Sequence, residues 1–349
     1  MGTRIGGFIG VAHTASNLSA SGIWDQESQA YFNRKGILHW PAGESYGPIV
    51  ATGGAVTIPG NGYKYHFFTA TGPFNVVSGF GKIDTYLVGG GGGGGFTPGG
   101  GAGGGAGGMR TVPQLDVSVG NYTVQCGAGS AGATQTNSET SNGSPSKITS
   151  VLGVLLVEAQ GGGGGAEAGH PVYTNAGKPG GSGGGGNYGG GAGGLGNRDP
   201  NNNPVPAQGN NGGVGYPSGP NYGGGGGGGA GGVGGNGANN GGPAGNGAHF
   251  SDPAINALPQ YGTPGPAAPM RYFAGGGGGG AYYSGGAVGA YGGGGNGGPP
   301  TPQPLSDRSG KANTGGGGGG MGHHSVGSSG PLQPAGNGGS GIVIVRYQI

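Results

Sequence analysis

The sequence predicts a mainly β and irregular protein, in which a bundle of polyglycine-II helices is capped by a small β-sheet and preceded by a short, partly helical N-terminal segment. Three observations predict this fold. Glycine supplies 107 of the 349 residues, often in pure runs. Strand-like segments lead directly into these runs, and the chain ends on an apolar strand at 342–347. The expected domains are an N-terminal segment, 1–48; a β-rich frame with the first glycine runs, 49–160; and a bundle with loops and a closing strand, 161–349.

The composition excludes several classes of protein. Charged residues make up 7% of the chain and the net charge is +2, which argues against a basic nucleic-acid-binding surface. A single cysteine, Cys126, cannot build a disulfide scaffold or a cysteine-based zinc site. No apolar stretch of about 18 residues is present, so membrane insertion is not expected. An ordinary α/β enzyme is disfavoured because each interior glycine costs about 0.5–1 kcal/mol relative to alanine.

Collagen and disorder also fit poorly. A collagen helix needs glycine at every third position, whereas here glycine fills whole runs, including 89–95, 223–229, 275–280 and 315–320. Disordered chains usually carry high net charge and few aromatics. This chain has 16 Tyr, 9 Phe and 2 Trp with almost no net charge. Ordered glycine structure is therefore the better interpretation.

Polyglycine-II geometry explains how such runs could order. The helix has three residues per turn and no internal hydrogen bonds, so its N–H and C=O groups need partners on neighbouring chains. Without side chains, helices of this kind can approach closely on all sides. Backbone hydrogen bonds then replace a hydrophobic core, and together with a β frame they must offset the entropy cost of ordering glycine.

The first 48 residues differ from the rest, because they hold both tryptophans. Trp24, Tyr31 and Phe32 are spaced to share one face of a helix, which Gly36 can end. One interpretation is a small satellite core on the main body. The other is an assembly interface that buries Trp24, Tyr31, Phe32 and Trp40 against another subunit, since about 48 residues can hardly form an independent core.

Apolar segments bounded by glycine, proline or asparagine predict the strands of the frame. Cys126 closes one of them and is expected to be a buried apolar residue rather than a nucleophile. The closing strand needs a partner for its apolar face, so the two ends of the glycine region should meet in one folded unit. The expected strands before it are 63–68, 74–77, 83–88, 122–126 and 151–157.

Three motifs carry a resemblance to a known family. They are a Phe-Thr-x-x-Gly-x-Phe-x-Val hairpin at 68–76, a Tyr-Leu-Val-Gly-Gly-Gly entry at 86–91 and a Gly-Gly-Ser-Gly-Ile-Val-Ile-Val-Arg-Tyr exit at 338–347. In this order they resemble the glycine-rich domain of tailed-bacteriophage virion proteins. The chain is also similar to the long-tail-fibre adhesins, whose fold is a sandwich of polyglycine-II helices with distal loops that touch the host receptor. The segment 19–24 is similar to a leader of marine phage structural proteins.

Counting the direction of each glycine segment predicts which loops lie far from the β-sheet. Segment 89–95 should run outward and 99–108 should return; the chain should leave again at Gly161, turn at 166–179 and return over 180–194. The loop 196–222 is then proximal, and 238–274 is a long distal loop. After Gly275 the count conflicts with the position of Ile342, so one loop after residue 281 is expected to interrupt a pass rather than reverse it.

Aromatic and amide side chains in the expected distal loops are candidate receptor contacts, because tyrosine and asparagine suit recognition surfaces. The alternative is that these rings only cover the bundle and shield its hydrogen bonds from water. The candidates are Tyr173, Asn175, His249, Phe250, Tyr261, Tyr272 and Phe273.

Catalytic chemistry is not expected. The Gly-Lys pairs at 177–178 and 310–311 lack the Ser or Thr of a phosphate-binding loop. His323 and His324 have no nearby carboxylate or thiol, so no metal site and no cofactor are expected. The few acidic residues form no recognisable pair.

The leading hypothesis is a phage tail-fibre or tail-tip adhesin that binds a host surface protein or glycan through loops on a rigid scaffold. Such a protein would be made in the host cytoplasm and reside in the virion tail, mounted on other tail proteins through its N-terminal segment; a homotrimer is compatible with this. One alternative is a tail or capsid building block without a receptor role. Another is an ice-binding polyglycine-II protein, although such proteins are shorter and present flat faces.

Overall fold

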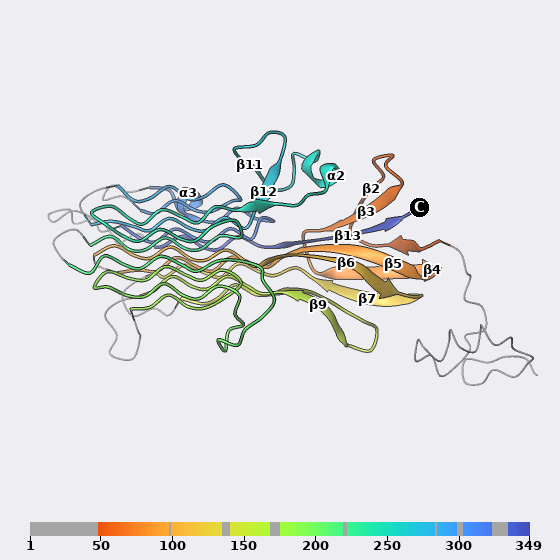
Figure 1. Ribbon diagram of the computed structural model, residues 1–349, viewed down its shortest axis with the longest axis horizontal. Helices are drawn as coiled ribbons and strands as arrows, with labels where there is room; N and C mark the ends of the chain where they lie inside the picture. Colours follow the sequence, from red (N-terminus) through yellow and green to blue (C-terminus); the bar gives the residue numbers. More distant parts are fainter. Residues whose placement is uncertain are drawn as a thin grey trace, which may run out of the picture.

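The computed structural model describes residues 48–97, 99–134, 140–167, 175–218, 222–282, 285–298, 303–322 and 334–349. These ranges form an elongated molecule, with β-sheets at one end and long glycine segments at the other (Figure 1). The segment 1–47, which carries Trp24, Tyr31, Phe32 and Trp40, lies outside the described residues.

The first sheet is built around the closing strand β13 (Ile342–Gln348). β13 pairs antiparallel with a strand on each side, so Val343 lies opposite both Phe68 and Leu87. This confirms the predicted strands 63–68, 83–88 and 342–347. The order is β2 (Ala55–Thr57), β3 (Tyr63–Phe68), β13, β5 (Gly81–Val88) and β6 (Met109–Val117).

The second sheet is also antiparallel, in the order β1 (Val50–Thr52), β4 (Gly72–Ser78), β7 (Gly120–Gln125), β8 (Ser146–Thr149) and β9 (Leu155–Ala159). The predicted strands at 74–77 and 122–126 fall on β4 and β7, but the prediction for 151–157 is wrong at its start. Residues 150–154 form a tight turn, in which the Gly153 N–H donates to the Ser150 carbonyl at 2.9 Å and Gly153 has φ +75°. Only glycine adopts this conformation without strain.

The main apolar core lies between the two sheets. β13 contributes Val343, Val345 and Tyr347, which pack with Phe74 and Val124 of the second sheet. Cys126 follows β7 and is partly buried, so the expected buried strand residue is confirmed only in part. It packs against this core, and its Sγ contacts the Phe68 carbonyl at 3.0 Å. Burial raises the pKa of this thiol to about 11, which keeps it protonated and unreactive.

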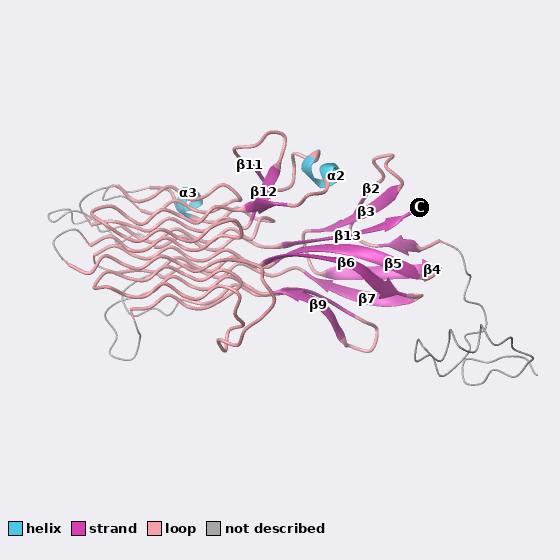
Figure 2. Cartoon of the chain, viewed as in Figure 1, coloured by secondary structure: helices cyan, strands magenta, loops and turns pink. Residues whose placement is uncertain are grey.

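The outer face of the first sheet is covered as well. Ile342 and Ile344 of β13 point to this face, because side chains alternate along a strand. Most of the residues that cover it belong to one segment, 248–274, which we call the lateral module (Figures 1 and 2); Ala106 and Ala230 of the glycine region add to this cover. The burial of both faces of β13 explains its uninterrupted apolar sequence. The module contains β10 (Ala248–His249), α2 (Pro253–Asn256), β11 (Thr263–Pro264) and β12 (Arg271–Phe273).

Two helices occur in the described residues, α2 and α3 (Leu305–Arg308), and each has four residues. Neither has the length or the apolar character that crossing a lipid bilayer would require. Figure 2 shows that the glycine region is drawn almost entirely as loop.

The glycine segments are held by backbone hydrogen bonds between neighbouring segments. Along 101–108, successive N–H donors point to different neighbours, and every third donor returns to the same one. A repeat of three residues therefore governs the contacts. Three donors point to the segment 315–321: Gly101 to Met321, Gly104 to Gly318 and Gly107 to Gly315. Two point to the segment 223–229: Gly103 to Gly225 and Ala106 to Gly228. Two point to the segment that begins at residue 160: Gly105 to Gly163 and Gly108 to Gln160.

Close approach of these backbones makes glycine necessary at most positions of the bundle. A Cβ on Gly104 would lie 2.2 Å from the carbonyl oxygen of Gly92, and one on Gly91 would lie 2.0 Å from that of Gly316. Both distances are far below van der Waals contact. The glycine content thus permits the packing, in which backbone contacts take the place of a side-chain core.

The predicted course of the chain is correct for 89–95 and 101–108, which run antiparallel, with the Gly89 N–H bonded to Gly108 and that of Gly95 to Ala102. The predicted course is wrong after residue 196, because segment 208–216 crosses the bundle once more from the sheet end to the far end. It is hydrogen-bonded along its length to neighbouring segments, so it is a pass of the bundle and not part of a loop. This pass contains Asn and Val among its glycines, so it does not look like a glycine run. Segment 223–229 therefore runs back toward the sheets.

The expectation that 238–274 is distal is consequently wrong, and so is the expected interruption after residue 281. The chain leaves the lateral module outward over 275–281 and returns over 286–291. It then runs outward over 294–298, back over 305–311, outward over 315–321 and back over 335–341 into β13, so five reversals follow the module. Segment 180–194 is also not one returning pass, because it reverses at Gly189 and Gly190, where φ is +84° and +78°.

Candidate functional site

The structure divides the sequence-predicted contact residues between two places. Asn175 is exposed and lies at the far end of the bundle, where its carbonyl accepts from the Asn187 N–H at 2.9 Å. Tyr173 lies outside the described residues. The other five lie in the lateral module at the sheet end: His249, Phe250, Tyr261, Tyr272 and Phe273.

Ring contacts fix this position of the module. Tyr261 stacks on Phe67 of β3 with centroids 4.6 Å apart, and Phe250 meets Tyr86 of β5 edge-on at 5.2 Å. Phe250, Tyr272 and Phe273 are buried within the described chain, whereas His249 is exposed. That these five contact a receptor stays a prediction, but they do not belong to a distal loop.

The far end of the bundle carries three tyrosines that the sequence reasoning missed. The rings of Tyr188 and Tyr222 lie 4.9 Å apart, and Tyr222 meets Tyr282 edge-on at 5.6 Å. Each comes from a different turn, and each is half-buried. We call Tyr188, Tyr222 and Tyr282 the distal tyrosine cluster.

Thr97, Gly99 and Gly100 support this cluster. Thr97 accepts from the N–H groups of Gly99 and Gly100 through its hydroxyl, at 3.3 and 3.0 Å. Gly99 lies against Tyr188 and Tyr222 so closely that a Cβ there would be 2.7 Å from the Tyr188 ring. Next to Thr97 in the chain, Phe96 packs in a small buried cluster with Ala133, Met321 and Ala335.

A sequence signal for the cluster does exist. Each of its tyrosines stands at or within two residues of the end of a glycine run: 183–186, 223–229 and 275–280. A rigid bundle would hold rings at the ends of neighbouring runs close together, and tyrosine offers a broad apolar face with a polar tip. The ends of the glycine runs were therefore a better indicator of which side chains gather at the far end of the bundle than the predicted loops were.

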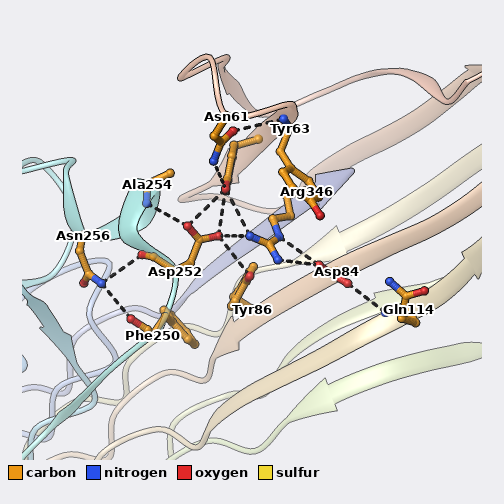
Figure 3. Close-up of polar contacts among 11 residues, drawn as sticks. Asn61, Tyr63, Asp84, Tyr86, Gln114, Phe250, Asp252, Ala254, Asn256 and Arg346 are labelled. Carbon is orange, nitrogen blue, oxygen red and sulfur yellow. Dashed lines mark hydrogen bonds and ion pairs between the residues drawn. The ribbon is translucent and has the colours of Figure 1, made fainter. Parts of the chain in front are cut away.

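A second notable site is the polar cluster between the first sheet and the lateral module, shown in Figure 3. Arg346 of β13 lies between two carboxylates. Its Nη1 is 2.6 Å from Oδ2 of Asp252, and its Nη2 is 2.9 Å from Oδ2 of Asp84. Asp252 is buried and also accepts hydrogen bonds from the hydroxyls of Tyr65 and Tyr86, at 3.0 and 3.2 Å.

The electrostatics of this cluster suit a structural clamp. Burial, and then the Asp252 carboxylate, raise the pKa of the Tyr86 hydroxyl well above its ordinary value, so Tyr86 remains a hydrogen-bond donor. Asp252 also caps α2, because its Oδ1 accepts from the Ala254 N–H at 2.9 Å. The cluster thus joins β3, β5 and β13 to the start of α2 and fixes the module on the sheet.

Across the ranges that the structure describes, no group of three or more His, Cys, Asp or Glu side chains is arranged to hold a metal ion. His323 and His324 lie outside those ranges. The two sites described above present aromatic rings, hydroxyls and ion pairs.

Comparison with known proteins bears on residues 69–348, which match the family described as the glycine-rich domain. The match runs from the hairpin between β3 and β4 to the end of β13, so it includes the frame, the bundle and the lateral module. A comparison with curated proteins finds no match. Since the family covers most of the chain, this protein belongs to the glycine-rich domain family.

Proposed function

We propose that this chain is a virion protein of a tailed bacteriophage, a tail-fibre or tail-tip adhesin that recognises a host cell-surface protein or glycan. The proposal begins from the resemblance of the hairpin, entry and exit motifs to phage glycine-rich domains. The observation that carries it further is the arrangement along the long axis of the molecule. The distal tyrosine cluster lies at one end of this axis, and Pro48 and the C-terminus lie at the other, with the sheets (Figure 1).

The scaffold in this proposal is a sandwich of polyglycine-II helices. The three-residue repeat of the donors along 101–108 supports it, since polyglycine-II has three residues per turn and bonds only to its neighbours. Segment 89–95 repeats the pattern, with Gly89, Gly92 and Gly95 donating to one neighbour, and Gly91 and Gly94 to another. Such a scaffold orders its end loops before a receptor arrives, which lowers the entropy cost of binding.

Attachment to the tail would be at the sheet end. Pro48, where the described chain begins, and Ile349 line the same pocket at that end. Since the described chain begins at the sheet end, mounting through Trp24, Tyr31, Phe32 and Trp40 would direct the far end of the bundle toward the host.

Receptor contact would fall on the distal tyrosine cluster and Asn175. Half-buried rings held by glycine backbones need little further ordering on binding, and Asn175 adds an adaptable amide. The alternative interpretation of these rings, that they only shield the bundle, predicts that their replacement changes stability but not binding.

The test uses purified protein as a competitor of phage adsorption to host cells. We expect the wild-type chain to reduce adsorption, and a variant with Tyr188→Ala, Tyr222→Ala and Tyr282→Ala to lose at least tenfold in potency. Leu152→Ala is the matched control, since Leu152 is 85% exposed at the opposite end. Unchanged potency of the triple variant would refute contact at the cluster. Immunogold labelling along the shell or tube, rather than at the tail tip, would favour the building-block alternative.

A further inference from the structure

The lateral module contains a pocket of about 370 Å³ that is distinct from the distal tyrosine cluster and shares only Asn256 with the residues of Figure 3. Its wall is mostly apolar, and its charged residue is Arg271 of β12. Pockets of this size commonly accept small ligands. The apolar lining comes mainly from Ala257, Pro259, Pro264, Ala268, Pro269 and Met270.

The guanidinium of Arg271 is held in a fixed orientation by three backbone carbonyls. Its Nε donates to Tyr261 at 2.9 Å, and its Nη2 donates to Pro259 at 2.7 Å and to Gly262 at 2.9 Å. These bonds use three of the five N–H donors of an arginine. The two donors on Nη1 make no hydrogen bond to any residue in the described part of the chain.

The charge of Arg271 is also without a carboxylate partner among the described residues, in contrast to Arg346, which is bound by Asp84 and Asp252. An arginine with a fixed plane and two open donors is suited to bind a carboxylate. Its position at an apolar pocket makes neutralisation by an acidic ligand more favourable than it would be in open water.

The rest of the wall defines what the ligand carries besides its acid group. Asn256 also lines the pocket, but its side chain is occupied: Nδ2 donates to the carbonyls of Phe250 and Asp252, and Oδ1 accepts from the Arg271 N–H. A ligand with many hydroxyls would therefore find few partners. An aliphatic chain, in contrast, would fit against the prolines and Met270.

The backbone around the pocket is firmly placed. Arg271 lies opposite Pro264 in the β11–β12 pair, and Gly265 rests on the ring of Tyr272, where a Cβ would lie 2.1 Å from the ring. The pocket is thus formed before a ligand arrives. We propose that it is a binding site for a small aliphatic carboxylate, with Arg271 as the residue that binds the acid group.

Saturation-transfer NMR on the full chain tests this site, with hexanoate as probe and hexan-1-ol and inorganic phosphate as comparison compounds. We expect saturable binding of hexanoate, at least tenfold weaker binding of hexan-1-ol because it has no charge, and at least tenfold weaker binding of phosphate because it has no apolar part. Equal affinity for hexanoate and either comparison compound would overturn the proposal, as would no binding of hexanoate.

Two variants locate the binding. Arg271→Gln should weaken hexanoate at least tenfold, but it also removes bonds that hold the loop. Ala257→Phe keeps those bonds and fills the pocket from an exposed position of its wall, so it should weaken hexanoate to the same degree with an unchanged melting temperature. Ala238→Phe, an exposed position elsewhere, is the control and should bind as wild type does. Hexanoate binding that survives Ala257→Phe would contradict the site.

Discussion

Replacing Gly104 with alanine should be far more costly than its small added volume suggests. A Cβ at this position would lie 2.2 Å from the Gly92 oxygen and 2.8 Å from the Gly93 oxygen. Ordinary contact begins near 3.4 Å, so one of the two segments must move by about 1 Å. Movement would disturb the bond from the Gly104 N–H to the Gly318 carbonyl, now 2.7 Å, and the bond that the Gly104 carbonyl accepts from Gly277.

The cost follows from these two effects. Overpacking in a close-packed interior costs about 1–3 kcal/mol, and each weakened backbone bond adds about 1 kcal/mol. We expect Gly104→Ala to lower the free energy of unfolding by about 2–4 kcal/mol, and the melting temperature in calorimetry by several degrees. Gly72→Ala is the control, because a Cβ on Gly72 meets nothing within 4 Å. It should be neutral or slightly stabilising, since alanine reduces the entropy of the unfolded chain.

The same melting temperature for Gly104→Ala and Gly72→Ala would refute the reasoning. It would mean that the glycine segments have room for side chains and that their contacts do not determine stability. Native alanines sharpen the comparison, since Ala102 and Ala106 are fully buried in the same segment. Burial alone is therefore tolerated; the position of the carbonyl opposite the Cβ determines the cost.

Three further predictions concern the frame. Asp252→Asn should destabilise the chain by about 2–4 kcal/mol, because Arg346 loses one of its two carboxylates. The lateral module should then be cleaved faster in limited proteolysis. Cleavage no faster than in wild type would contradict the role of this cluster as a clamp. Burial lowers the pKa of His66, so between about pH 7 and pH 5 the unfolded chain binds a proton there more readily than the folded chain does. The free energy of unfolding should therefore fall as the pH drops through this range. In melting curves recorded at several pH values, His66→Gln should reduce this dependence of the melting temperature on pH. Cys126, with its pKa raised to about 11, should react with a thiol reagent at pH 8 only after unfolding, and rapid reaction in native buffer would show an accessible thiolate.

Much of the frame could be predicted from the sequence because its signals are local. The alternating or continuous apolar segments at β3, β5 and β13 mark strands, since burial of one or both faces leaves a direct pattern in the residues. β6 and β8 lacked such a pattern. β6 is an edge strand with Pro113 and a positive φ at Gln114, and most of its side chains are exposed or half-buried.

The course of the bundle could not be predicted as well, for a different reason. A pass is defined by backbone bonds to neighbours far away in the sequence, and segment 208–216 makes them while carrying Asn and Val. Missing one pass reverses the direction of everything that follows, which put the lateral module at the wrong end. The distal tyrosine cluster was missed because its three rings come from three turns that only the packing of the passes brings together.

Arg271 illustrates the same limit for a binding site. Its residue type and its place after a proline-rich segment are visible in the sequence, but the three carbonyls that orient it are not. Whether an arginine is paired or open to a ligand depends on tertiary placement, as the contrast with Arg346 makes plain.

Amide hydrogen exchange of segment 101–108 in the native protein tests most directly the claim that glycine backbones form the interior of this molecule. Every N–H of this segment from Gly103 to Gly108 donates to a carbonyl of another segment at 2.7–2.9 Å. We therefore predict protection comparable to that of β13, the central strand of the first sheet. Exchange of these amides at the rate of an unstructured peptide, with β13 still protected, would contradict the claim that glycine backbones form the interior.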